Sequence, residues 1–203
     1  MRSGEDRSRL LEQARQKEPG ALGRLLDSYR NYLRVLAQTG VGKALQGKAD
    51  PSDLVQEATK KAWEHFDQFR GFTEAELAGW LRQILARCLA DLVRHFVHDK
   101  GRRSGREQSL DQLLGRSSQA LQRLLAADTT SPSAAAERRD LGVVLSDALA
   151  ELGPDHRSVL VLRHLQELDW PEVAARMGRS PGAVRMLWAR ALRELRPLLE
   201  ARL

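Results

Sequence analysis

Residues 169–193 restrict the possible fold more than any other part of the sequence. Apolar residues recur at helical spacing up to Met177, and Gly178 follows where a residue in the left-handed conformation can end a helix. Ser180 then suits the N-cap of a second helix, and Pro181 suits its first position. This spacing predicts a helix-turn-helix, a motif whose second helix can enter the major groove of DNA.

The charge of this stretch favours the same interpretation. From Arg176 to Arg196 the sequence contains six Arg and one Glu. Arg suits phosphates and guanine edges because its planar guanidinium makes two parallel hydrogen bonds. The alternative is an ordinary pair of helices with a solvated basic face, which the spacing alone leaves open. The excess of Arg and the Ser-Pro helix start favour DNA binding.

The second helix of this motif indicates which side chains would face DNA. Val184 and Leu187 mark its inward face, so Arg185 and Met186, with Ala189 beyond them, are expected in the groove. Arginines on either side are placed to meet phosphates. The full set of expected DNA contacts is Arg179, Ser180, Pro181, Gly182, Arg185, Met186, Ala189, Arg190 and Arg193.

The overall composition suits a polyanionic partner and gives no sign of catalysis. The 203 residues have a net charge of +6 and a pI ≈ 10.0. Cys88 is the single cysteine, which excludes an internal disulfide and a cysteine-based zinc site. The sequence contains no phosphate-binding, dinucleotide-binding or nucleophile-elbow motif, so we expect no metal, no cofactor and no enzymatic activity. It also lacks an apolar signal core and a run of about 18 apolar residues, so we expect a cytoplasmic protein without membrane insertion.

Helical periodicity extends over most of the chain and predicts an all-α fold. One apolar stripe spans residues 21–38, and the longest runs from Leu77 to Val97 and includes Cys88 as a buried residue. Residues 39–53 contain three Gly and a Pro, so they are expected to form a connection. Because no stretch alternates with period two, we expect no sheet.

The helix that follows Pro51 combines an apolar face with an acidic one. Its inward set is Leu54, Val55, Ala58, Ala62, Trp63 and Phe66. Residues 50–76 contain seven acids and three bases, a net charge of −4 within a basic protein. The outer positions, among them Asp53 and Glu57, form either a solvated face with helix-start carboxylates or a docking face for a basic protein surface.

A turn and a basic helix come next. Residues 68–74 form the turn, in which Phe69 and Phe72 are expected to be exposed beside Arg70. The outer face of the following helix contains three arginines, Arg82, Arg87 and Arg94.

Residues 99–139 separate two helical blocks, because Ser, Gly, Arg, Gln and Ala dominate there as in a flexible linker. From Leu141 onward the helical pattern returns and predicts four helices, the last two being the helix-turn-helix. The expected organisation is an N-terminal polar segment at 1–20, a first helical domain at 21–100, a flexible linker at 101–137 and a four-helix domain at 138–203.

Taken together, these blocks resemble a bacterial RNA polymerase sigma factor of the sigma-70 family, in its small extracytoplasmic-function group. The family's clamp-docking helix of region two resembles DPSDLVQEATKKAWEHFDQFRG, at residues 50–71. Its segment that melts and reads the −10 promoter element resembles FTEAELAGWLRQILARCLADLVRH, at residues 72–95. Its region four, which reads the −35 element, resembles LSDALAELGPDHRSVLVLRHLQELDWPEVAARMGRSPGAVRMLWARALREL, at residues 145–195.

The resemblance implies a role for each set of residues. Core-polymerase docking falls on Asp50, Asp53, Gln56, Glu57 and Lys60. Binding of the −10 element falls on Phe69, Arg70, Phe72, Arg82, Arg87 and Arg94. Binding of the −35 element falls on the nine residues of the helix-turn-helix named above. The implied partners are core RNA polymerase, through its clamp and flap, promoter DNA, and an anti-sigma protein, which no residue here identifies.

Some residues depart from the family pattern, and two other functions stay open. Arg87-Cys88 stands where many relatives have Asn, and Trp170-Pro171, Met186 and Trp188 are unusual. The promoter sequence that relatives recognise therefore cannot be assigned to this chain. A free-standing helix-turn-helix regulator with a sensing or dimerising N-terminal domain is the main alternative to a sigma factor. A small nucleic-acid-modifying enzyme is the other, although no converging polar residues indicate one.

Overall fold

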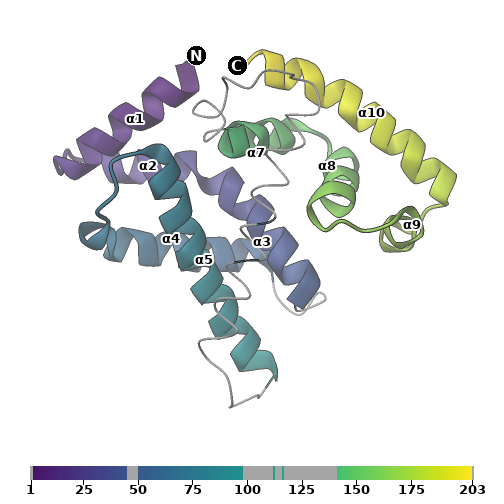
Figure 1. Ribbon diagram of the computed structural model, residues 1–203, viewed down its shortest axis with the longest axis horizontal. Helices are drawn as coiled ribbons and strands as arrows, with labels where there is room; N and C mark the ends of the chain where they lie inside the picture. The colour runs from purple at the N-terminus through teal and green to yellow at the C-terminus, as the bar shows by residue number, and fades with distance from the viewer. Residues whose placement is uncertain (1, 45–49, 98–111, 113–115, 117–140, 203) are drawn as a thin grey trace. The chain divides into compact units, whose positions relative to one another are not determined.

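The computed structural model describes residues 2–44, 50–97, 112, 116 and 141–202, and every regular element in them is helical (Figure 1). The chain divides into two compact units, Arg2–Ser118 and Gln119–Leu203. For the described residues, the prediction of an all-α fold with two helical domains is confirmed. Most of the expected linker lies outside these residues. None of the described helices is both long and apolar enough to cross a membrane.

The N-terminal unit is built around a long helix that packs against its neighbours. Its described elements are α1 (Arg2–Arg15), α2 (Ala21–Ser28), α3 (Arg30–Ala44), α4 (Pro51–Glu64), the 3-10 turn η1 (Phe66–Gln68) and α5 (Glu74–Val97). Helices α3 and α4 pack against α5, and α1 packs on α2 and α5. Fully buried side chains form the core, among them Tyr29, Tyr32, Leu25, Leu36, Leu77, Leu81 and Leu89. Cys88 is buried with them, as predicted.

Two helix boundaries differ from the sequence prediction. The stripe over 21–38 is divided between α2 and α3, because the backbone turns at Tyr29 and buries its ring completely. Helix α3 also continues to Ala44, so the first part of the expected connection is helical. Thr39 and Val41 are buried there, and the Thr39 hydroxyl donates to the Val35 carbonyl oxygen at 3.1 Å. Packing therefore outweighs the low helix propensity of the glycines in this stretch.

Residues 2–15 of the polar segment expected at 1–20 form helix α1 of the first unit. Leu11 and Ala14 of α1 are buried where the helix packs on α2 and α5. The Ser8 hydroxyl donates to the side chain of Glu74, the first residue of α5. Helix α1 is therefore anchored beside the loop that precedes α5.

That loop, residues 69–73, has a specific fold that corrects one expectation. Phe69 is buried rather than exposed, because its ring lies 5.3 Å from the Trp80 ring and 5.9 Å from the Phe66 ring, between centroids. Phe72 behaves as expected and is 76% exposed. A Cβ atom added at Gly71 would lie 2.5 Å from the Phe69 ring, so the close approach requires glycine.

A glutamate one turn into α5 fixes the other side of the loop. The Glu76 carboxylate accepts from the backbone N–H of Phe72 at 2.8 Å, from that of Thr73 at 2.9 Å and from the Thr73 hydroxyl. The Glu76 N–H in turn donates to Thr73 Oγ1 at 3.2 Å, which completes a capping box. These hydrogen bonds, led by the one from Phe72, hold the pKa of Glu76 below its ordinary value.

The C-terminal unit has the four helices that were predicted. They are α7 (Leu141–Glu151), α8 (Pro154–Leu160), α9 (Trp170–Met177) and α10 (Pro181–Glu200), and α8 continues into the π-helical turn η4 (Val161–Leu165). Helix α10 packs against α7, α8 and α9 (Figure 1). The most buried side chains are Leu145, Ala148, Leu149, Val159, Leu160, Val173, Val184 and Ala191.

Substitution of Gly71 tests the fold of the loop. We expect Gly71→Ala to destabilise the chain by about 1–3 kcal/mol, because the new methyl group must displace the Phe69 ring or the backbone. Gly79→Ala is the matched control, since no atom lies within 4 Å of the added Cβ in the interior of α5. That change should stabilise the helix by about 0.5–1 kcal/mol. Urea denaturation followed by circular dichroism measures both, and equal effects would count against the loop geometry.

Candidate nucleic-acid and protein interfaces

The turn between α9 and α10 is fixed by local hydrogen bonds. Gly178 has φ of 63° and ends α9 in the left-handed conformation, as predicted. The N–H of Arg179 donates to the Ala174 carbonyl oxygen at 3.0 Å. Ser180 caps α10 by accepting from the Ala183 N–H at 3.2 Å, and Pro181 occupies the first turn. The predicted helix-turn-helix is therefore present, with the predicted residues at its corner.

The start of α9 has a capping box that the sequence analysis missed. The Asp169 side chain accepts from the Glu172 N–H at 2.8 Å, and the Glu172 carboxylate accepts from the Asp169 N–H at 2.9 Å. Each carboxylate satisfies a backbone donor that the helix itself leaves free. The D-x-x-E spacing in the sequence was the available signal.

Helix α10 presents one face to solvent and buries the other. Val184 and Leu187 are buried, as predicted. Met186 is 58% exposed, and Arg185 is exposed beside it. Among the other expected DNA contacts, Ala189 is half-buried. The rest are exposed, namely Ser180, Pro181, Gly182, Arg190 and Arg193.

Arg179 has a partner within the unit. Its guanidinium lies 2.5 Å from the Asp155 carboxylate at the start of α8. Both side chains are about half exposed, at 41% and 57%, so the pair is worth no more than about 1 kcal/mol.

An aromatic cluster joins η4, α9 and α10. Trp188 Nε1–H donates to His164 Nε2 at 2.8 Å, and the two rings are stacked with centroids 6.0 Å apart. The Trp170 ring meets the Trp188 ring edge-on at 5.6 Å. The guanidinium carbons of Arg163 and Arg185 lie 4.9 Å and 5.8 Å from the Trp170 ring centroid. The unusual Trp170 and Trp188 therefore brace the second helix of the motif and one of its exposed arginines.

The hydrogen bond from Trp188 requires a neutral His164. Nε2 can accept only when the ring proton is on Nδ1, so a protonated imidazole would lose the bond. Burial, and next the charge of Arg163, lower the pKa of His164 below its ordinary value. The sequence offered no signal for this contact, because the two residues lie 24 positions apart on different elements.

The acidic face of α4 is exposed, as expected. Asp53, Gln56, Glu57 and Lys60 point to solvent, and Asp50 caps the helix by accepting from the Ser52 N–H at 2.7 Å. Trp63 was expected in the core but is 54% exposed. Its ring lies beside Gly23 of α2, where an added Cβ would be in ordinary van der Waals contact with it, at 3.5 Å.

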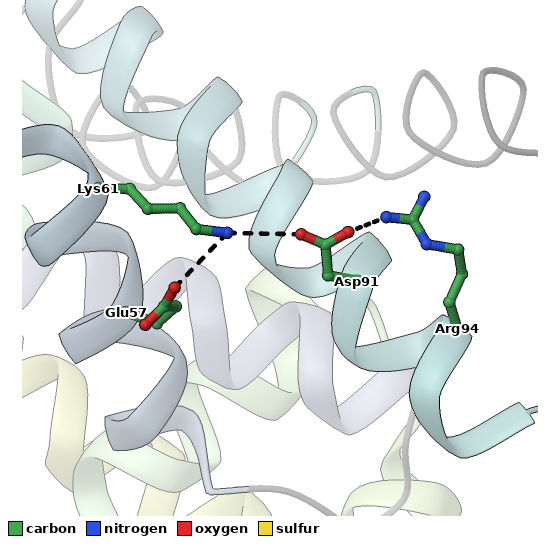
Figure 2. A network of polar contacts seen from close by, with 4 residues as sticks. All are labelled: Glu57, Lys61, Asp91 and Arg94. Atoms are coloured by element: carbon green, nitrogen blue, oxygen red, sulfur yellow. Dashed lines mark hydrogen bonds and ion pairs between the residues drawn. The ribbon is translucent and has the colours of Figure 1, made fainter. Parts of the chain in front are cut away.

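A network of charged side chains joins α4 to α5 (Figure 2). Lys61 Nζ lies 3.6 Å from Glu57 on its own helix and 3.4 Å from Asp91 on α5. Arg94 binds the other oxygen of Asp91. Of the three arginines expected on the outer face of α5, Arg94 is thus held in an ion pair, Arg82 is half-buried and Arg87 is exposed.

The pKa of His164 generates a prediction about pH. Because the folded pKa is lowered, the unfolded chain takes up this proton first as the pH falls through about 6.5, and the C-terminal unit loses stability. In His164→Gln the amide oxygen can still accept from Trp188 but does not titrate. We expect the urea midpoint of the wild type to fall more than that of the variant between pH 7.5 and 5.5. The indole N–H signal of Trp188 in NMR spectra reports the transition, and parallel losses in both proteins would contradict this assignment.

The chain is similar to known proteins over most of its length. Residues 143–195 match the family described as Sigma-70, region 4. The chain is 30% identical over 190 residues to the ECF RNA polymerase sigma factor BldN of Streptomyces coelicolor, with 94% of this chain and 64% of that protein covered. It is 34% identical over 120 residues to the RNA polymerase sigma factor CarQ of Myxococcus xanthus, with 59% of each covered. It is 46% identical over 59 residues to the RNA polymerase sigma-E factor of Streptomyces antibioticus, with 29% of this chain and 33% of that protein covered.

The chain thus spans between a third and just under two thirds of the length of these relatives. The region-four match coincides with the helical unit that contains the helix-turn-helix, from within α7 to near the end of α10. The similarity to BldN extends over the N-terminal unit as well, since it covers 94% of this chain. The fold, the geometry of the motif and these similarities together show that the chain belongs to the sigma-70 family, in its extracytoplasmic-function group.

Proposed function

We propose that this chain is a sigma factor, which binds core RNA polymerase and directs it to promoters for strand opening and initiation. The observation that supports this most is that one chain presents two exposed faces of opposite charge. Helix α4 presents Asp53 and Glu57, and α10 presents Arg185, Arg190 and Arg193. An acidic face suits a basic protein surface and an Arg face suits DNA, so the chain can bind both.

In this proposal α4 docks on the polymerase clamp. The docking set is Asp50, Asp53, Gln56, Glu57 and Lys60, all of them exposed. Attraction between these carboxylates and a basic surface orients the chain and raises the rate of association more than the affinity. The contact between Lys61 and Glu57 neutralises part of the face but leaves Asp53 open to a partner.

The loop 69–73 and α5 are proposed to hold the melted −10 strand. Phe72 is 76% exposed and can stack on an unpaired base, which is worth about 1–3 kcal/mol per base. Arg70 and Arg87 are exposed and suit phosphates. Phe69 supports the loop from beneath instead of stacking on a base. Arg82 and Arg94 are less exposed, and Arg94 must leave Asp91 to meet a phosphate.

The second helix of the motif is proposed to read the −35 element. Arg185 and Met186 would face base edges, while Arg179, Arg190 and Arg193 would meet phosphates. The capped start of α10, at Ser180, Pro181 and Gly182, is exposed, and the Gly182 N–H in its first turn suits a phosphate, whereas Pro181 has no N–H to donate. Because both DNA-binding segments belong to one chain, binding of one raises the effective concentration of the other at the promoter. Two modest contacts then give a higher overall affinity.

A free-standing regulator is not favoured. Such a protein would resemble sigma factors in its helix-turn-helix alone, whereas the similarity to BldN covers 94% of this chain. Co-purification with core RNA polymerase separates the proposals, because neither a free-standing regulator nor an enzyme needs the polymerase. We expect a stable one-to-one complex, and failure to bind core polymerase would contradict a sigma factor.

Charge reversal on α4 tests the docking face. Asp53→Lys combined with Glu57→Lys should weaken core binding at least tenfold, because repulsion replaces attraction across the interface. Glu12→Lys combined with Glu18→Lys is the matched control, since both residues are exposed acids of the same unit outside α4. Binding is measured by fluorescence anisotropy with labelled chain, and helicity is checked by circular dichroism. Equal affinities of the two double variants would place docking elsewhere.

Two arginines of α10 should respond differently to DNA sequence. Arg185→Ala should cost about 1–3 kcal/mol on the cognate promoter and relax the preference at one −35 position. Arg193→Ala should weaken binding to all sequences alike and reduce the salt dependence by about one counterion. The two variants, each bound to core polymerase, are compared on cognate and scrambled −35 DNA across a salt series. If they behave alike, Arg185 is only a phosphate contact and Met186 becomes the better candidate for base reading.

A further inference from the structure

We propose that Arg15, the last residue of α1, is a positioning residue for Phe72 during promoter opening. The proposal rests on the proposed function, because it assigns α1 a part in the loop that would bind the melted strand. The sequence assigned no functional residue to α1, and the region-four match lies at residues 143–195.

Two contacts join Arg15 to neighbouring residues of the loop, 56 and 57 positions away. Its guanidinium carbon lies 4.1 Å from the centroid of the Phe72 ring. The same guanidinium donates a hydrogen bond to the carbonyl oxygen of Gly71. A planar guanidinium can make both contacts at once, because it stacks on the ring through its face and donates through its edge.

The position of Arg15 is set by buried residues of its own helix. Leu11 and Ala14 are buried one turn and one residue before it. Ser8, near the middle of α1, is bonded to Glu74 at the start of α5, and the helix packs on α2 and α5. The packing of α1 therefore places the Arg15 side chain at the loop in the chain by itself, before any partner binds.

The contacts of Arg15 complement those of Glu76. Glu76 holds the backbone of Phe72 and Thr73, but no bond from it reaches the ring. Arg15 lies over the ring, which is still 76% exposed. One face of the Phe72 ring is thus supported by a cation while the rest stays open to solvent. An unpaired base that stacks on the open face meets a ring whose orientation is already set, which lowers the entropy lost on binding.

The test uses the full chain bound to core polymerase on a mapped promoter. The variants are Arg15→Ala, Arg15→Lys, Phe72→Ala and the combination of Arg15→Ala with Phe72→Ala. Arg9→Ala is the matched control, because Arg9 is an exposed arginine of the same helix that pairs only with Asp6 in the described contacts. Permanganate reactivity of −10 thymines measures opening, and a gel-shift assay at low temperature measures closed-complex binding.

We expect Arg15→Ala to slow opening about 3- to 10-fold, the size of effect that ordering one side chain produces. Closed-complex binding and the Arg9→Ala variant should be unchanged. In the Phe72→Ala background, Arg15→Ala should have no further effect, because the two residues act as one unit. Arg15→Lys should restore only part of the rate, since an ammonium cannot keep both contacts.

Other outcomes would overturn the proposal. Full rescue by Arg15→Lys, with an effect that persists in the Phe72→Ala background, would make Arg15 a phosphate contact. A second measurement needs no polymerase: NMR of 13C-labelled Phe should show a more mobile Phe72 ring in Arg15→Ala than in wild type. If the chain fails to bind core polymerase but the ring is mobilised, the proposed function fails and the positioning contact stands. If the ring is unaffected, the positioning contact itself is wrong.

Discussion

The backbone N–H groups at the start of a helix need partners, and this requirement fixes where the helices of the proposed binding segments begin. Helix α4 is capped by Asp50, α5 by Thr73 with Glu76, α9 by Asp169 with Glu172, and α10 by Ser180. By contrast, Gly20 and Gly153 precede α2 and α8 and contribute no side-chain cap. Each such cap is worth about 0.5–2 kcal/mol, enough to fix where a helix begins and so which side chains it exposes.

These caps connect local sequence to binding. Because α10 begins at a defined residue, Arg185 and Met186 lie on the outer face whenever Val184 and Leu187 are buried. Because Glu76 holds the loop before α5, Phe72 is exposed at a fixed place. Binding to a partner then costs little conformational entropy at these groups, so more of the contact energy contributes to affinity.

The parts of this structure that depend on neighbours in sequence could be predicted. The left-handed Gly178, the capping Ser180 and the burial of Cys88 follow from signals within a few residues or from a helical stripe. Parts that depend on distant residues could not. Phe69 is buried because Trp80 lies on the next helix, and Trp63 stays 54% exposed although it occupies an inward position of the apolar pattern. The capping boxes at 73–76 and 169–172 were readable from their spacing and were missed.

Run-off transcription with core polymerase on fragmented genomic DNA tests the central claim most directly. A sigma factor with two pre-formed DNA contacts should produce transcripts from a limited set of start sites, each with a common pair of upstream sequence elements. These transcripts should disappear when the chain is left out. If the chain binds DNA but core polymerase with the chain starts at no specific site, the account of this molecule as a promoter-specificity subunit is wrong.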